Sequence, residues 1–193
     1  MELTTSRATR SAGAWACLLI PLILGLAADL ALKNQSFAAL VTERFYNDSG
    51  RLTGVDSRET QLIPGFLHLR AHINFGAVFG IGQGNRVLFV AVSVMALGLL
   101  IHLFVRSGRQ RIYQVLLGML IAGVLGNFYD RVYFGYVRDM IYALPKWGIF
   151  PWIFNIADTL LCVGVGGMFC YSIFVREEPS GDVSRIDTAR PKA

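Results

Sequence analysis

Four long runs of apolar residues are separated by shorter polar segments along the 193 residues of the chain. Each run has about 20 residues, the length that a helix needs to cross a hydrocarbon layer about 30 Å thick. Inside lipid, a backbone amide must be bonded within its own segment, so each run is expected to be a helix. The predicted spans cover about 14–33, 86–105, 112–129 and 152–175.

The segment between the first two spans, residues 34–85, has a different pattern. Residues 66–74 alternate apolar and polar side chains, which predicts a β-strand. Residues 48–50 and 55–57 have the composition of turns. The sequence therefore predicts an all-α membrane protein with four transmembrane helices and a small extracytoplasmic β-sheet between spans one and two.

Composition agrees with a membrane protein of one domain. Apolar residues make up 54% of the chain and charged residues only 16%, whereas a soluble domain carries about 25% charged residues. We expect one integral membrane domain over residues 1–176. The polar segment 177–193, which contains two prolines and mixed charges, is expected to be a disordered cytoplasmic tail.

The arginines predict the orientation of the spans. Two arginines precede the first span, three lie in the link 106–111, and Arg176 follows the fourth span. By contrast, arginines and acidic residues balance one another in segment 34–85. The positive-inside rule therefore predicts that both termini are cytoplasmic and that segments 34–85 and 130–151 lie outside.

A cleavable signal peptide is the alternative interpretation of the first span, because basic residues precede an apolar run that contains small residues at 25–28. We expect the span to be retained, since the run continues through Asp29 to Lys33 without a polar break.

Neither nucleic-acid binding nor a metal or cofactor is indicated. The net charge is +5, but the basic residues are scattered among the short links and form no stripe. His68 and His72 have no evident third ligand nearby. The cysteines lie in apolar runs, where they are typical packing residues; they are Cys17, Cys162 and Cys170.

Polar residues from every part of the chain are predicted to meet at the outer membrane face. An ionisable group at the centre of a membrane helix costs about 2.5–3.5 kcal/mol, so its position is informative. The cytoplasmic halves of the spans contain no Asp, Glu, Lys or Arg, and His102 is their one histidine. The outer groups are Asp29, Lys33, Asn74, Asn127, Asp130, Arg131, Asp139, Asn155 and Asp158.

Several of these groups have a structural explanation. Asp29 with Lys33, and Asp130 with Arg131, are expected to be structural ion pairs. The three asparagines fit helix caps or interhelical hydrogen bonds as well as they fit substrate contacts. The glycine-rich run 76–84 lacks the G-K-[ST] ending of a phosphate loop, so a flexible turn is expected.

Asp139 and Asp158 are different, because neither has an evident helical partner three or four residues away. Two carboxyl groups that face each other cannot both ionise, so they share a proton. The ionised member can take a proton from water, and the protonated member can donate to a scissile carbonyl. The pair therefore predicts peptide hydrolysis without a covalent intermediate.

At these residues the sequence resembles the bacterial lipoprotein signal peptidases, also called signal peptidase II. Four blocks carry the resemblance and touch all four spans. They are D-L-A-L-K at 29–33, N-F-G-A-V-F at 74–79, G-N-F-Y-D-R with G-Y-V-R-D within 126–139, and F-N-I-A-D at 154–158.

The resemblance implies an intramembrane aspartic endopeptidase that removes signal peptides from diacylglyceryl-modified prolipoproteins at the outer face of the bacterial cytoplasmic membrane. It implies that Asp139 and Asp158 are catalytic. The expected partners are the lipid-modified prolipoprotein and membrane phospholipid, and we expect a monomer. The positions implied to bind substrate are Asn74, Asn127, Arg131 and Asn155; those implied to support the site are Asp29, Lys33, Gly76 and Asp130.

The chain departs from the family pattern in a longer segment 34–85, in Ala122 where glycine is common, and in Arg138 where an apolar residue is usual. Because neighbours on an extended strand point to opposite sides, we expect Arg138 to face away from the site if Asp139 faces it. The alternatives are a small transporter or channel with carboxylates in its outer vestibule, and a non-catalytic scaffold. Against transport, no chain of carboxylates crosses the membrane.

Overall fold

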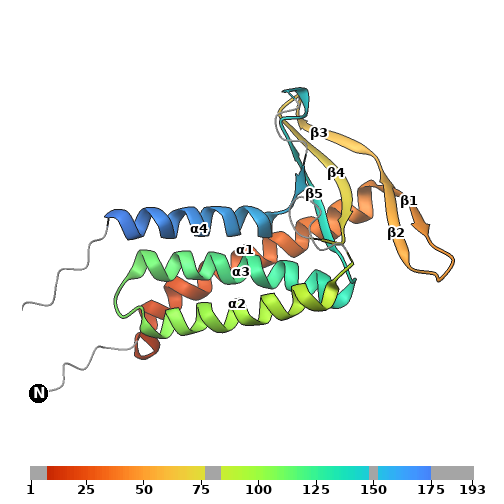
Figure 1. The fold of residues 1–193 in the computed structure, drawn as a ribbon. Coiled ribbons are helices and arrows are strands. Elements are labelled where there is room, and N and C mark those ends of the chain that lie inside the picture. The colour runs from red at the N-terminus through yellow and green to blue at the C-terminus, as the bar shows by residue number, and fades with distance from the viewer. Residues whose placement is uncertain (1–7, 77–83, 148–151, 175–193) are drawn as a thin grey trace, which may run out of the picture.

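Four long helices form a bundle in the computed structural model, which describes residues 8–76, 84–147 and 152–174. Each helix is long and apolar enough to cross a membrane, as the sequence predicts. They run side by side, with the strands gathered beyond one end of the bundle (Figure 1). The helices are α1 (Ala12–Leu40), α2 (Arg86–Arg106), α3 (Arg111–Tyr133) and α4 (Ile156–Phe174).

The ends of the helices differ from the predicted spans. Helix α1 continues to Leu40 because Phe37 and Leu40 pack into a buried cluster beneath the strands. At about 1.5 Å per residue its 29 residues extend well beyond a hydrocarbon layer about 30 Å thick. Helix α4 begins later than predicted, since residues 153 and 154 form a short strand before it.

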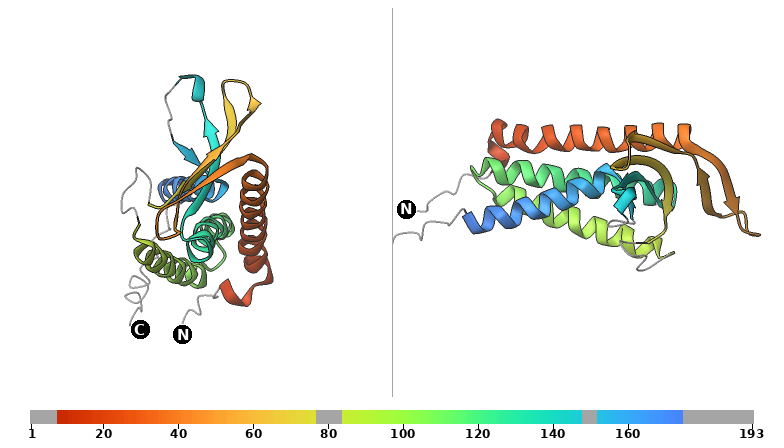
Figure 2. Two further views of the ribbon diagram at one scale, coloured as in Figure 1. Left: turned by 90° about the vertical axis from the view of Figure 1, so that its right-hand side faces the viewer. Right: turned by 90° about the horizontal axis from the view of Figure 1, so that it is seen from above.

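Helix α3 lies at the centre of the bundle and contacts each of the other three helices, as the end-on view in Figure 2 also shows. Glycines on α3 allow the backbones to approach closely. A Cβ atom at Gly118 would lie 2.3 Å from the carbonyl oxygen of Leu18 on α1, and one at Gly123 would lie 2.6 Å from that of Ala157 on α4. The close packing fixes α1 and α4 relative to α3.

The strands after α1 form a hairpin of β1 (Val41–Tyr46) and β2 (Leu52–Ser57). The predicted turn at residues 48–50 connects them and is confirmed. The predicted turn at residues 55–57 is wrong, because these residues belong to β2. Val55 packs against the buried cluster beneath the strands, and this burial outweighs the local turn preference of Asp56 and Ser57.

A second sheet has the antiparallel order β3-β4-β5-β6. The strand predicted at 66–74 is confirmed as β4. The sheet does not come from segment 34–85 alone, because β5 and β6 belong to the link between α3 and α4. Its strands are β3 (Glu59–Ile63), β4 (Leu67–Asn74), β5 (Val137–Ala143) and β6 (Ile153–Phe154).

Two apolar clusters hold these parts together. One lies among the helices and includes Leu18, Phe104 and Leu117. The other lies where the sheets meet the end of α1 and includes Phe37, Ile73 and Met140. Met140 is fully buried directly after Asp139 in β5. The second cluster therefore fixes the strand that carries one of the predicted catalytic residues.

The close contact between α1 and α3 predicts that Gly118→Ala destabilises the protein. The added methyl group meets backbone at Leu18 and cannot move aside, so the free energy of unfolding should fall by about 1–3 kcal/mol. Gly98→Ala on α2 is the matched control, because no atom lies within 4 Å of its added Cβ. Thermal unfolding in detergent measures both, and equal stability of the two variants would contradict this packing.

Candidate active site

The pairing of β4 with β5 positions the first two residues of the site, Asn74 and Asp139. Asn74 at the end of β4 pairs with Val137, and His72 pairs with Asp139. Asp139 is only 1% exposed. The strand β6 then leads directly into α4, whose first turn carries Asp158. Two segments that follow α3 thus bring both predicted catalytic residues to the same end of the bundle.

Asn155, immediately before α4, is bonded to both carboxyl groups. Its Oδ1 accepts a hydrogen bond from the backbone N–H of Asp158 at 2.9 Å, and its Nδ2 donates to Asp139 Oδ1 at 2.6 Å. In return, Asp158 Oδ2 accepts from the backbone N–H of Asn155 at 3.3 Å. This reciprocal arrangement is a capping box. Asn155 is therefore both the cap of α4 and the link between the two aspartates.

Asn74 and Asn127 complete the hydrogen bonds to the pair. Asn127 Nδ2 donates to Asp158 Oδ1 at 2.8 Å, and Asn74 Nδ2 donates to Asp139 Oδ2 at 3.3 Å. Asn74 Oδ1 accepts from the backbone N–H of Gly76 at 2.9 Å, which fixes the orientation of its amide. All four carboxylate oxygens of the pair therefore have a donor from the protein.

The environment of Asp139 favours a proton on its carboxyl group. Burial raises its pKa to about 8, and the neighbouring charge of Asp158 acts in the same direction. The hydrogen bonds from Asn155 and Asn74 lower the pKa, but burial has the larger effect. The two carboxyl groups thus have different surroundings, as an acid and base pair requires.

A buried cluster of charges lies behind the pair. Lys33 Nζ is 2.7 Å from Asp29 Oδ2, so the predicted pair within α1 is confirmed. The predicted pairing of Asp130 with Arg131 is wrong. Asp130 is instead bonded to Lys33 at 3.3 Å and to Arg138 at 2.8 Å.

The helix geometry of α3 explains this difference. Consecutive residues on a helix are about 100° apart around its axis, so Asp130 and Arg131 face different neighbours. The guanidinium of Arg131 lies 4.8 Å from the ring centroid of Phe89 and donates to the carbonyl oxygen of Gly76 at 3.2 Å. Arg138 points away from the site and toward Asp130, as we expected from its place beside Asp139.

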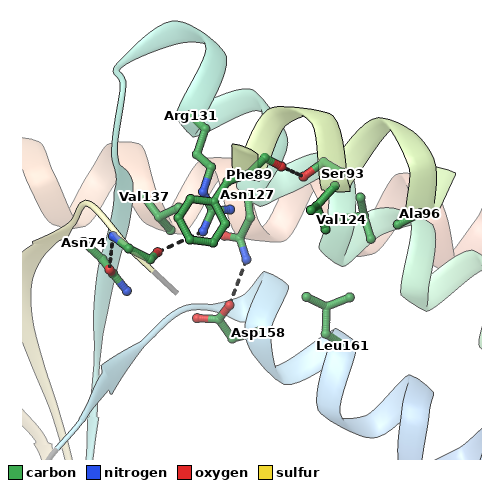
Figure 3. A pocket seen from close by; sticks show the side chains of 12 residues that line it. Asn74, Phe89, Ser93, Ala96, Val124, Asn127, Arg131, Val137, Asp158 and Leu161 are labelled. Carbon is green, nitrogen blue, oxygen red and sulfur yellow. Dashed lines mark hydrogen bonds between the residues drawn. The ribbon is translucent and has the colours of Figure 1, made fainter. Parts of the chain in front are cut away.

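A cavity of about 250 Å³ opens beside Asp158, between α2, α3 and α4 (Figure 3). Polar residues line it near Asp158, and apolar residues line the rest. Asp139, which is almost fully buried, is not part of the lining. The polar lining is Asn74, Asn127, Arg131, Asp158 and Ser93; the apolar lining includes Phe89, Val92, Ala96, Val124 and Leu161.

The sequence did not identify the α2 side of this cavity, because apolar residues on a membrane helix that face a cavity have the same composition as those that face lipid. The described residues contain no group of three or more His, Cys, Asp or Glu side chains that could hold a metal ion. Residues 77–83, which include most of the glycine-rich run, lie outside the described residues.

Comparison with known proteins identifies the family. The sequence model described as signal peptidase (SPase) II matches residues 22–174. The chain belongs to the signal peptidase II family. Signal peptidase II is a peptidase, so the chain is a hydrolase, and its four candidate membrane spans make it a multi-pass membrane protein.

Curated relatives and solved structures agree with this assignment. The lipoprotein signal peptidase of Halalkalibacterium halodurans is 37% identical over 109 residues, which are 56% of this chain and 69% of the relative. That of Enterococcus faecalis is 40% identical over 114 residues, 58% of this chain and 69% of the relative.

Two solved structures, each described as a bacterial membrane enzyme, share the fold. One has a TM-score of 0.67 and 26% sequence identity, and the matched region covers 89% of this chain and 93% of the chain in that structure. The other has a TM-score of 0.64 and 30% sequence identity, and the matched region covers 80% of this chain and 91% of the chain in that structure.

The buried cluster of this signal peptidase II chain predicts that Lys33→Met is strongly destabilising. The substitution leaves Asp29 and Asp130 close together without their shared cation, and breaking such a buried pair costs about 3–5 kcal/mol. Chemical unfolding in detergent measures the loss. Lys146→Met, at an exposed lysine, is the control; a similarly small loss for both variants would show that the cluster does not hold the helices together.

Proposed function

We propose that the chain is an intramembrane aspartic endopeptidase that removes signal peptides from diacylglyceryl-modified prolipoproteins, with Asp139 and Asp158 as its catalytic pair. One observation carries the proposal: a single residue, Asn155, is bonded to both carboxyl groups, to that of Asp139 through its side-chain amide and to that of Asp158 through its backbone N–H, and Asp158 lines a cavity. The substrate class is supported by family membership and by relatives named lipoprotein signal peptidase. Family membership does not favour the transporter alternative.

The two carboxyl groups have different roles in this mechanism. Asp158 lines the cavity and, as the ionised member, takes a proton from a water molecule whose oxygen attacks the scissile carbonyl carbon. Asp139, whose pKa is raised by burial, donates its proton to the carbonyl oxygen. When the C–N bond of the resulting diol breaks, Asp158 gives its proton to the leaving amine. Asp139 then recovers its own proton as the new carboxyl group forms.

The residues around the pair are proposed to hold the substrate. Arg131 is placed to donate to carbonyl oxygens of the peptide backbone, and Gly76 fixes the neighbouring Asn74. Asn127 and Asn155 keep the carboxylates in position. Asn127 also lines the cavity and is proposed to contact the peptide, whereas Asn155 is fully buried. The apolar part of the cavity, between α2 and α4, accepts side chains of the signal peptide that lie within the bilayer.

The positions of the arginines support a membrane orientation. Three arginines, Arg106, Arg109 and Arg111, lie where α2 ends and α3 begins, at one end of the bundle, and the strands lie at the other end (Figure 1). Asp139 belongs to one of these strands, β5. The positive-inside rule therefore supports cytoplasmic termini and an extracytoplasmic active site in the bacterial cytoplasmic membrane. We propose one domain over residues 1–176, a cytoplasmic tail over 177–193, and a monomer surrounded by phospholipid.

Replacing either catalytic aspartate should abolish proteolysis. Asp139→Asn and Asp158→Asn keep the shape of the side chain but cannot carry the charge or the shared proton. We expect cleavage of a diacylglyceryl-modified prolipoprotein to fall by about 10²–10⁴-fold in each purified variant. Asp48→Asn, in the exposed turn between β1 and β2, is the matched control and should cleave at the normal rate. Normal cleavage by either catalytic variant would refute the pair.

The raised pKa of Asp139 predicts the alkaline limit of activity. Below a pH of about 8 its carboxyl group holds the proton that the carbonyl oxygen needs, and above it the proton is lost. The value of kcat/KM, which reports on the free enzyme, should therefore fall as pH rises through about 8. A constant kcat/KM through this range, for enzyme that stays folded, would contradict the role of Asp139 as acid.

A further inference from the structure

Arg138 is a buried charged residue that the mechanism above does not use. It directly precedes Asp139 in β5 and is only 4% exposed. Its Nε and Nη2 donate to Asp130 Oδ1 at 3.0 and 2.8 Å, and its Nη1 donates to Asn34 Oδ1 at 2.6 Å. Its guanidinium lies 4.3 Å from the ring centroid of Phe134. Contacts from α1, from α3 and from Phe134 directly after α3 therefore fix this side chain.

Asp130 divides its two oxygens between Arg138 and Lys33. Oδ1 accepts from the guanidinium, whereas Oδ2 accepts from the backbone N–H of Arg138 at 2.9 Å and lies 3.3 Å from Lys33 Nζ. Lys33 is closer to Asp29, at 2.7 Å. When all four side chains are ionised, two negative and two positive charges balance in this buried cluster.

Lys33 connects the cluster to the catalytic pair. Its ammonium group has three protons, and its third contact is a hydrogen bond to Asn127 Oδ1 at 3.2 Å. Because Asn127 Oδ1 is an acceptor, its Nδ2 is turned toward Asp158 Oδ1, to which it donates at 2.8 Å. Without the guanidinium, Asp130 would have only Lys33 as a charged partner and would draw its ammonium away from Asn127.

Resting on the proposed function, we propose that Arg138 is a positioning residue for the catalytic pair. Its guanidinium holds Asp130, so that Lys33 can orient Asn127 and, through it, the carboxylate of Asp158. The same guanidinium keeps the cluster neutral and so limits the negative potential at the pair. The Arg138 side chain lies on the side of β5 that faces Asp130, away from the catalytic pair, and does not contact substrate.

The net charge of the cluster determines the direction in which the pKa of the pair should change in each variant. Loss of Arg138 leaves the cluster with an excess negative charge, which favours a proton on the pair; loss of the Asp130 charge leaves an excess positive charge, which disfavours it. The cavity residues contributed by α2 carry no charge. Of the other charged groups, Lys33 acts on Asp139, and Arg131 interacts with both carboxyl groups of the pair. Asp29 is paired with Lys33, and His72 lies opposite Asp139 in the sheet, with Arg70 as its charged neighbour.

The test is the pH dependence of kcat/KM for cleavage of a diacylglyceryl-modified prolipoprotein. In Arg138→Met, we expect kcat to fall by about 10–100-fold with little change in KM. We also expect the alkaline limb of the profile, where kcat/KM falls as pH rises, to move to higher pH. In Asp130→Asn, the alkaline limb should move to lower pH. The double variant removes one charge of each sign and should return the limb to its normal position. Arg51→Met, at an exposed arginine of the outer hairpin, should match the unsubstituted enzyme.

Arg138→Lys separates charge from geometry. It keeps the positive charge but lacks the planar fork that reaches both Asp130 and Asn34. We expect the normal alkaline limb with a reduced kcat, and this variant together with Asp130→Asn tests the proposal even if Arg138→Met does not fold. Shifts of the same sign in Arg138→Met and Asp130→Asn, or an unchanged profile in both folded variants, would overturn the positioning role.

The failure of this proposal can be distinguished from the failure of the proposed function. If Asp139→Asn and Asp158→Asn lose cleavage while Arg138→Met retains the normal kcat and pH profile, only the positioning role is wrong. If either catalytic variant cleaves normally, the proposed function fails whatever Arg138 does.

Discussion

The rest of the structure depends on the contacts of one buried charge, the ammonium group of Lys33, which lies where α1 meets α3. A charge without water is tolerated only when it is paired and its hydrogen bonds are satisfied. Lys33 meets that requirement through Asp29 on its own helix and through Asp130 and Asn127 on α3. Asp29 in turn accepts from the backbone N–H of Ala157 on α4 at 2.9 Å. Lys33 and its partner Asp29 therefore together join three of the four helices at the level of the site.

The same polar network gives the catalytic carboxyl groups unequal surroundings. Asp139 is enclosed between the sheet and the start of α4, whereas Asp158 reaches the cavity. Asn155 donates to both carboxyl groups, from its side chain to Asp139 and from its backbone N–H to Asp158, and so positions one relative to the other. Because the hydrogen bonds exist before any substrate arrives, little reorganisation is needed in the reaction. The arrangement suits an acid and a base that act on one water molecule.

Much of this could be predicted from the sequence. Long apolar runs predicted the four helices, and the expense of polar groups in lipid predicted that Asp139 and Asp158 meet at one membrane face. Strand β5 was not predicted, because Arg138 and Asp139 are adjacent and interrupt any alternation. The partners of Asp130 were also missed. They depend on how β5 lies against α1 and α3, which joins side chains such as Asn34 and Arg138 that are far apart in the chain.

The central claim is that the free enzyme holds one proton on the Asp139–Asp158 pair at neutral pH. Infrared difference spectroscopy can detect the C=O stretch of a protonated carboxyl group in the purified protein. The account predicts a band that is present at neutral pH, disappears as pH rises through about 8 and is absent from Asp139→Asn. A neutral-pH spectrum without such a band, or a band that persists unchanged in Asp139→Asn, would contradict it.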